Sequence, residues 1–213
     1  MKLQPSPRRS RGFTLIELIT VVTLLAVLAG LAMIATQSAM NRSHRAKTEG
    51  QLRAIENKLA QYQTENGSLP LPKSGANNED GLKADVGGVS YPAAGAQALY
   101  QALTADGDSA LEGGDTQSSG KLGSLEGERV FWGDLDPNTN PQGLVKKKDD
   151  STIYLVDAFG VPWQYKVSKF ANSSAPYDPE LDVDMHNKKG FDLWSYGGTG
   201  KDYMNETKWI KNW

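Results

Sequence analysis

The sequence predicts an α+β fold, with one long N-terminal helix packed on a small antiparallel sheet and a large loop-rich insertion between them. Three observations predict this fold. An apolar N-terminal run passes into a polar stretch whose apolar residues have helical spacing. The middle of the chain is rich in Gly, Ser, Asn and Asp. The clear strand-like segments come after residue 150, and a long helix against a small antiparallel sheet is an α+β arrangement.

Residues 13–36 form the first half of the predicted helix, a transmembrane or filament-core segment. The run from Phe13 to Ala35 is apolar apart from one acid, Glu17. As a helix it is about 34 Å long, which is enough to cross a bilayer. Four basic residues precede it, and they predict that the N-terminus stays in the cytoplasm. A carboxylate in such a segment is costly, so Glu17 is a functional candidate.

Residues 37–66 continue the helix as an amphipathic segment. Its apolar residues recur at spacings of 3, 4 and 3 on one face, and they are Leu52, Ile55, Leu59 and Tyr62. Gly67 follows as a stop signal. We expect the apolar face to pack against a globular head. The basic side chains just past the membrane segment, His44, Arg45 and Lys47, are expected on a solvated face.

Residues 67–150 form a variable, loop-rich region with a short helix over residues 93–105. We expect residues 68–92 to be a loop and residues 106–127 to be a mobile loop, because both are rich in turn-forming residues. Residues 129–132 are predicted to be a short strand. Two charge-rich segments are predicted to lie in solvent: Lys146–Asp150 and the alternating acids Asp178, Glu180, Asp182 and Asp184.

Residues 151–213 carry the predicted antiparallel sheet and a C-terminal loop. Residues 153–157 and 163–167 are predicted strands, and the intervening Gly160 and Pro162 predict that they form a hairpin. Residues 191–196 are a third predicted strand, which ends at two glycines.

The N-terminal segment has three interpretations. A secretory signal peptide has a shorter apolar core and a cleavage site after that core, whereas here the small residue, Gly12, precedes it. A simple membrane anchor leaves Glu17 unexplained. The run Gly12-Phe13-Thr14-Leu15-Ile16-Glu17 resembles the prepilin signature of type IV pilins and pseudopilins.

This resemblance implies a processing route and a filament. A prepilin peptidase would cut between Gly12 and Phe13, and the new N-terminal Phe13 would be N-methylated. Glu17 would then meet the positive N-terminus of a neighbouring subunit during filament assembly. A buried carboxylate and a buried ammonium are each costly alone and much less so together.

The C-terminal third carries a second resemblance. Residues 157–165 are similar to a hairpin segment of the major pseudopilin of type II secretion systems. Residues 191–197, Phe-Asp-Leu-Trp-Ser-Tyr-Gly, and the terminal Ile-Lys-Asn-Trp also resemble that family. The resemblance implies an inner-membrane protein with a periplasmic head that enters a periplasmic pseudopilus. Its implied partners are further copies of itself, other pseudopilins, the prepilin peptidase, the inner-membrane assembly platform and membrane lipid.

The same resemblance implies calcium in the C-terminal loop, but two expected acids are replaced, by Thr199 and by the Lys208-Trp209 pair. Calcium prefers several oxygen ligands, usually including carboxylates. Weak candidate ligands are Tyr196, Thr199, Asp202 and Glu206. No cofactor is predicted firmly. In the alternative, Trp209 packs into the head and holds the loop without metal.

Composition excludes several classes of function. Loss of the prepilin leader, residues 1–12, changes the net charge from −2 to −6, which argues against nucleic acid as a partner. No Cys is present, so disulfides cannot form. The chain lacks a phosphate-binding loop, a nucleophile elbow and a zinc pattern, so it is not predicted to be an enzyme. A type II pseudopilin, a type IV pilus or competence pilin, and a membrane-tethered ligand-binding module remain.

Overall fold

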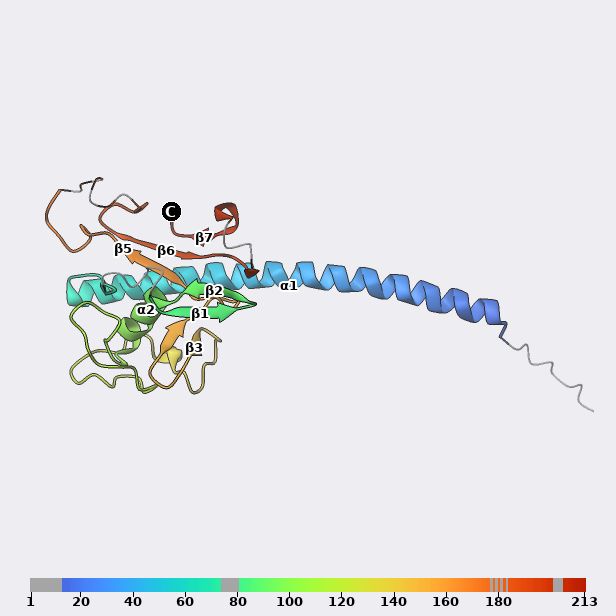
Figure 1. The fold of residues 1–213 in the computed structure, drawn as a ribbon, viewed down its shortest axis with the longest axis horizontal. Helices are drawn as coiled ribbons and strands as arrows, with labels where there is room; N and C mark the ends of the chain where they lie inside the picture. The colour runs from blue at the N-terminus through green and yellow to red at the C-terminus, as the bar shows by residue number, and fades with distance from the viewer. Residues whose placement is uncertain are drawn as a thin grey trace, which may run out of the picture. The chain divides into compact units, whose positions relative to one another are not determined.

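The computed structural model describes residues 13–73, 81–176, 178, 180, 182, 184–200 and 205–213. A long helix and small antiparallel sheets confirm the predicted α+β class. The chain divides into two compact units, one that ends at Ser43 and one that begins at His44. Figure 1 shows three small sheets and a second helix gathered around the last part of the long helix, within the second unit.

Helix α1 runs from Leu15 to Asn66, so the prediction of one continuous helix to Asn66 is confirmed. It begins two residues later than expected because Thr14 caps it. The helix ends at Gly67, which has a φ of 71° and whose N–H donates to the Gln63 carbonyl at 2.9 Å. Glycine adopts this left-handed conformation without the steric cost that a Cβ would add.

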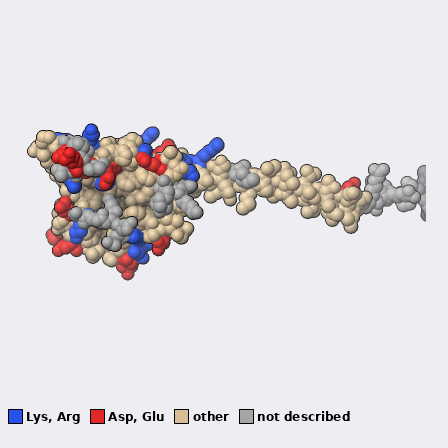
Figure 2. Space-filling model, turned by 45° about the horizontal axis from the view of Figure 1, so that its top comes forward, with Lys and Arg blue, Asp and Glu red and all other residues tan. Residues whose placement is uncertain are grey.

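The first unit, through Ser43, exposes its apolar side chains. Phe13 is 76% exposed and Val21, less so, is 45% exposed. Figure 2 shows a helix surface almost without Lys, Arg, Asp or Glu, whereas the head carries charges of both signs. Among the described residues, α1 contains the one segment long and apolar enough to cross a membrane. Apolar exposure on this scale indicates a surface that lipid or other protein covers.

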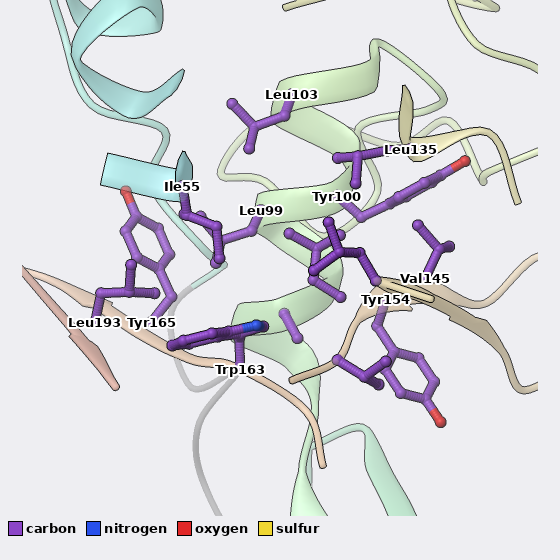
Figure 3. Packing of buried hydrophobic residues seen from close by; sticks show 14 of the residues in the cluster. Ile55, Leu99, Tyr100, Leu103, Leu135, Val145, Tyr154, Trp163, Tyr165 and Leu193 are labelled. Atoms are coloured by element: carbon purple, nitrogen blue, oxygen red, sulfur yellow. The ribbon is translucent and has the colours of Figure 1, made fainter. Parts of the chain in front are cut away.

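The core of the second unit forms where α1, α2 and the strands meet. Leu52, Ile55 and Leu59 of the predicted stripe are buried, and Tyr62 packs beside them. Helix α2, Ala94–Thr104, confirms the predicted short helix and packs against two strands. Figure 3 shows how side chains from distant parts of the chain meet there, among them Ile55, Leu99, Tyr100, Trp163, Tyr165 and Leu193.

In the described part of the chain, seven short strands form three antiparallel sheets, and two 3-10 turns flank them. Strands β1 (Lys83–Val86) and β2 (Val89–Pro92) form the first sheet, and β3 (Val145–Lys147) and β4 (Ile153–Leu155) form the second. The third has the order β5 (Gln164–Val167), β6 (Phe191–Ser195) and β7 (Ile210–Lys211). The 3-10 turns are η1 (Gly133–Leu135) and η3 (Glu206–Lys208).

The β1–β2 hairpin corrects the prediction that residues 68–92 form a loop. Val86 pairs with Val89 across a two-residue turn, Gly87-Gly88, and both glycines have positive φ. Paired residues with positive φ are typical of the tight turns that match strand twist. The two glycines between short alternating segments were the sequence signal from which this hairpin could have been predicted.

The predicted hairpin of residues 153–157 and 163–167 is wrong. Strand β4 pairs with β3, and β5 pairs with β6, so the two strands belong to different sheets. A single bridge, Val156 to Pro162, joins them. The predicted tight turn is therefore present, but the strands on its two sides pair with β3 and β6 and not with each other. Strand β3 lies in the predicted charge run, whose lysines are exposed as expected.

Residues 129–132 form no strand, because Phe131 and Trp132 both donate their N–H groups to the Leu103 carbonyl at 2.9 Å. Residues 106–127 are irregular, as predicted, yet they are hydrogen-bonded around the buried Asp106. The prediction that the acidic run is solvated is wrong for Asp182, which is 6% exposed and accepts from the Ser168 hydroxyl. Asp184 is exposed, as expected.

Candidate assembly site

The first turn of α1 holds Glu17 in a reciprocal cap with Thr14. The Glu17 carboxylate accepts from the Thr14 N–H at 2.9 Å and from its hydroxyl at 2.8 Å. The Glu17 N–H in turn donates to the Thr14 hydroxyl at 3.3 Å. This capping box satisfies amide groups that the first helical turn leaves without partners.

The cap changes the interpretation of Glu17. The sequence predicts a carboxylate without a partner in lipid, but in the structure Thr14 supplies two hydrogen bonds. Among the described residues, no cation pairs with Glu17, and its side chain is exposed. Phe13 is described and exposed, whereas Gly12, on the other side of the predicted cleavage site, lies outside the described residues.

The base of the head, where α1 meets the C-terminal loop, contains an arginine that sequence reasoning had placed in solvent. Arg45 is half-buried, and its Nη1 donates to the Lys208 carbonyl at 2.9 Å and to the Gly197 carbonyl at 3.4 Å. One guanidinium thus joins both ends of the loop to the helix. The planar fork of donors on Arg suits such a role.

The neighbouring basic side chains are also engaged. The His44 ring lies against Phe159, with centroids 5.3 Å apart, and the Lys47 Nζ donates to the Gln142 carbonyl at 2.9 Å. The expectation of a solvated face is therefore wrong for His44 and Arg45. Lys47 is exposed as expected, but it makes a specific contact. Spacing along the helix gave no signal of these partners, because they come from 95 residues or more farther along the chain.

Gly197 makes the arginine contact possible. A Cβ added there would lie 2.2 Å from the Lys208 carbonyl oxygen and 2.9 Å from the Arg45 Nη1. Its φ of 71° is also unfavourable for other residues. Any side chain at this position would therefore separate the two ends of the loop.

An aromatic cluster holds the same loop from the other side. The Trp209 ring lies 6.0 Å from Trp194 and 5.4 Å from Tyr196, which confirms that Trp209 packs into the head. Tyr91, from the unforeseen hairpin, lies 5.7 Å from Tyr196, and its hydroxyl accepts from the Gly200 N–H at 2.8 Å. The hairpin thus supports the C-terminal loop.

The candidate calcium ligands are dispersed in the described part of the loop. Tyr196 is buried in the aromatic cluster and Thr199 is exposed. Glu206 pairs with Lys211 at 2.7 Å, and this lysine holds the pKa of Glu206 below its ordinary value. Asp202 lies outside the described residues. Within those residues, no group of three or more His, Cys, Asp or Glu could hold a metal ion.

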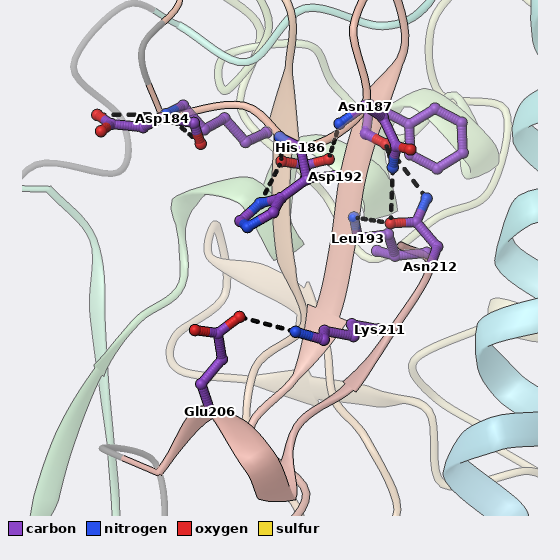
Figure 4. Close-up of polar contacts among 10 residues, drawn as sticks. Asp184, His186, Asn187, Asp192, Leu193, Glu206, Lys211 and Asn212 are labelled. Carbon is purple, nitrogen blue, oxygen red and sulfur yellow. Dashed lines mark hydrogen bonds and ion pairs between the residues drawn. The ribbon is translucent and has the colours of Figure 1, made fainter.

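Asn212, next to last in the sequence, anchors this end of the chain to β6, as Figure 4 shows. Its side-chain oxygen accepts from the Leu193 N–H at 2.9 Å and from the Asn187 amide at 3.2 Å. Its side-chain nitrogen donates to the Phe191 carbonyl at 3.2 Å. One side chain makes all of these hydrogen bonds, so Asn212 holds this end of the chain against β6.

Asp157 performs a similar role in the turn before β5. Its buried carboxylate accepts from the N–H groups of Phe159 and Val161 at 2.8 and 2.9 Å, and from the Ser195 hydroxyl. Burial raises the pKa of Asp157, although these hydrogen bonds oppose the shift. The bond to Ser195 ties the turn to the end of β6.

Comparison with known proteins adds one match to this geometry. A prokaryotic N-terminal methylation motif matches residues 7–33. The chain carries a type IV pilin-like N-terminus. No curated protein and no solved structure matches the chain.

The matched motif coincides with the beginning of α1 in the structure. The methylation motif spans the capped first turn and most of the exposed apolar segment of α1. Such a motif is typical of subunits that a prepilin peptidase processes and that assemble with similar subunits. The one apolar helix among the described residues that could span a membrane is consistent with membrane anchoring.

Proposed function

We propose that this protein is a structural subunit of a type II secretion pseudopilus, which polymerises through its N-terminal helix to drive export of folded proteins. The observation that carries the proposal is an exposed apolar helix with a single acid in its first turn, inside a methylation motif. Burial of that surface against other copies removes it from water or lipid, and this packing drives association. The role is structural, and the protein is not an enzyme.

We assign the processing roles to three residues. The prepilin peptidase cuts after Gly12 and Phe13 becomes the methylated N-terminus. The Glu17 carboxylate pairs with the amino group of a neighbouring copy. The surroundings of Glu17 support this role, because among the described residues its carboxylate has hydrogen bonds but no cation near it. The amino group of a neighbouring copy would supply that cation.

The protein has its head in the periplasm and begins in the inner membrane. Its partners are further copies, other pseudopilins, the peptidase, the assembly platform and, before assembly, membrane lipid. The resemblance of the C-terminal segments to the major pseudopilin supports secretion over a pilus. Asp157, Ser195 and Asn212 from those segments form hydrogen bonds that hold the head together. A type IV pilus or competence pilin is the alternative that the N-terminal helix alone would equally support.

We also propose that the C-terminal loop needs no calcium. Arg45 supports this proposal, because its guanidinium takes up the two main-chain oxygens, at Gly197 and Lys208, that could otherwise contribute to a cation site. A metal ion beside this guanidinium would meet repulsion between like charges.

One experiment tests the polymer and then its role. The full chain is expressed with a prepilin peptidase and an assembly platform, and sheared material is examined by electron microscopy. We expect filaments. Their absence would favour a membrane-tethered ligand-binding module. Deletion of the gene in its native host should abolish secretion of folded proteins while twitching and DNA uptake continue, and the reverse result would favour the pilus alternative.

A further inference from the structure

A groove in the second unit contains a buried amide group that lacks hydrogen bonds. The groove has a volume of about 400 Å³ and lies between α1 and the segment that ends at Leu144. Its walls include Gly50, Gln51, Ala54, Trp132, Pro141 and Leu144. We call it the Gln51 groove.

Gln51 is 6% exposed, and neither its Nε2 nor its Oε1 has a hydrogen-bond partner among the residues that the structure describes. Nearly all buried polar groups in folded proteins have partners, because a group that has lost water without replacing it destabilises the fold. An amide with both atoms free is therefore an exception that calls for a ligand. The ligand must offer one donor and one acceptor side by side.

Gly50, next to Gln51, independently indicates that this face is kept open. It lies inside α1, where glycine is less favourable than alanine. A Cβ added at Gly50 would meet nothing within 4 Å, so packing within the chain does not require glycine. A neighbouring molecule that approaches the helix closely would require it.

The groove is closed over its amide in the isolated chain. Lys47 lies one turn before Gln51 on the same helical face, and its Nζ reaches across to the Gln142 carbonyl. This contact is exposed, so it is easily exchanged for water. Movement of the lysine would open the mouth of the groove.

We propose that the Gln51 groove receives an amide side chain from α1 of a second copy of this protein. This proposal rests on the polymerising role proposed above. In the unit that ends at Ser43, before the head, α1 offers two amides one turn apart, Gln37 and Asn41, both exposed and without side-chain hydrogen bonds among the described residues. Two amides can pair reciprocally, each as donor and acceptor.

The pairing sets the offset between copies. Helices of copies that share a membrane orientation run in the same direction. A contact from Asn41 to Gln51 then places the second copy about 15 Å along the helix, and one from Gln37 about 21 Å, at ~1.5 Å per residue. A contact from Phe13 to Glu17 requires only about 6 Å. The groove therefore binds a different neighbour from the one that Glu17 meets.

Cysteine cross-linking of the full chain in cells tests this contact directly, because the chain has no cysteine of its own. Gly50→Cys is combined with Asn41→Cys or with Gln37→Cys, and the cells are oxidised. Nine or more residues of helix separate the two positions, about 13 Å, so a disulfide within one chain is not possible. We expect a ladder of covalent multimers in at least one double variant.

Asn41→Cys with Arg53→Cys is the matched control, because Arg53 is exposed on α1 about 200° around the helix from Gln51 and does not line the groove. We expect no ladder from it. Filaments without a ladder from either amide position would overturn this inference and leave the proposed function intact. Absence of filaments from the parent chain would overturn both.

A second variant separates binding from folding. Gln51→Met keeps the length of the side chain but removes both polar atoms. We expect the head to be at least as stable as in the parent chain, because a buried group without partners is removed. We expect about tenfold fewer filaments, from the loss of one buried hydrogen-bonded pair. A normal number of filaments from Gln51→Met would overturn the inference.

Discussion

The Arg45 Nη1 donates to the Lys208 main-chain oxygen across 163 residues of sequence, at 2.9 Å. The same nitrogen lies 3.4 Å from the Gly197 carbonyl oxygen. A side chain of α1 therefore holds both ends of the C-terminal loop. The loop and helix can separate only if a charged hydrogen-bond donor loses its partners.

Arg45→Met should weaken the head. Hydrogen bonds to a charged group contribute about 1.5–3 kcal/mol, and partial exposure of Arg45 places the expected loss at about 1–2 kcal/mol. The measurement is denaturant unfolding of the full chain in detergent, followed by tryptophan fluorescence. All five tryptophans lie beyond residue 131, so the signal reports on the head.

Arg53→Met is the control, since Arg53 is exposed on the same helix and makes no hydrogen bond or ion pair within the described residues.

We expect EGTA to leave the melting temperature of the parent chain unchanged. A drop of many degrees on chelation would show that calcium, and not Arg45, holds the loop.

Asp106 should make the head sensitive to acid. Burial by itself raises the pKa of Asp106, but hydrogen bonds from Ser119, Tyr100 and Ser124 outweigh it, and the net pKa is lowered. A lowered folded pKa stabilises the protein above the ordinary Asp value, and this contribution is lost as the pH falls through the folded pKa. Unfolding free energies measured from about pH 7 to about pH 3 should show the loss.

Asp106→Asn should remove this part of the pH dependence and lower stability near neutral pH by about 1–3 kcal/mol, because an amide cannot accept all of those bonds. Asp150→Asn, at an exposed carboxylate, is the matched control. Asp157, whose pKa is raised, acts in the opposite direction in every variant, so the difference between parent and Asp106→Asn isolates Asp106. An unchanged pH profile in Asp106→Asn would contradict the assignment.

Glu17→Val should block filament assembly while membrane insertion and leader cleavage continue. The variant loses both the negative charge and the cap on Thr14. Glu17→Gln separates the two, since its amide oxygen can still accept from Thr14 but carries no charge. We expect neither variant to assemble, as judged by sheared filaments. Normal filaments from Glu17→Gln would show that the cap, and not charge pairing, is what assembly needs.

Gly12→Ala, or a larger residue at this position, should stop processing. The peptidase is expected to need glycine, without any side chain, before the cleaved bond, so the leader should remain attached. Intact-mass spectrometry of the membrane fraction measures this directly, and the parent chain should begin at Phe13 with one added methyl group. A mature mass identical to that of the parent would refute the role of Gly12.

Local signals were enough to predict both helices. The spacing of Leu52, Ile55 and Leu59 defines one face of a helix whatever it packs against, and Gly67 ends that helix through its own conformational freedom. Strand positions were also visible in part. The pairing of the strands was not visible. Residues 153–155 pair with residues 145–147, which overlap a run of charges that does not look like a strand.

The sequence by itself determined the assembly helix: the apolar run, its single acid Glu17 and the Thr14 cap depend on residues within one or two turns of each other. Only the tertiary structure decided what holds the head together. Arg45 with Lys208, Tyr91 with Gly200, and the free amide of Gln51 depend on which distant segments meet. Such contacts follow from the packing of the whole core, and no local pattern specifies them.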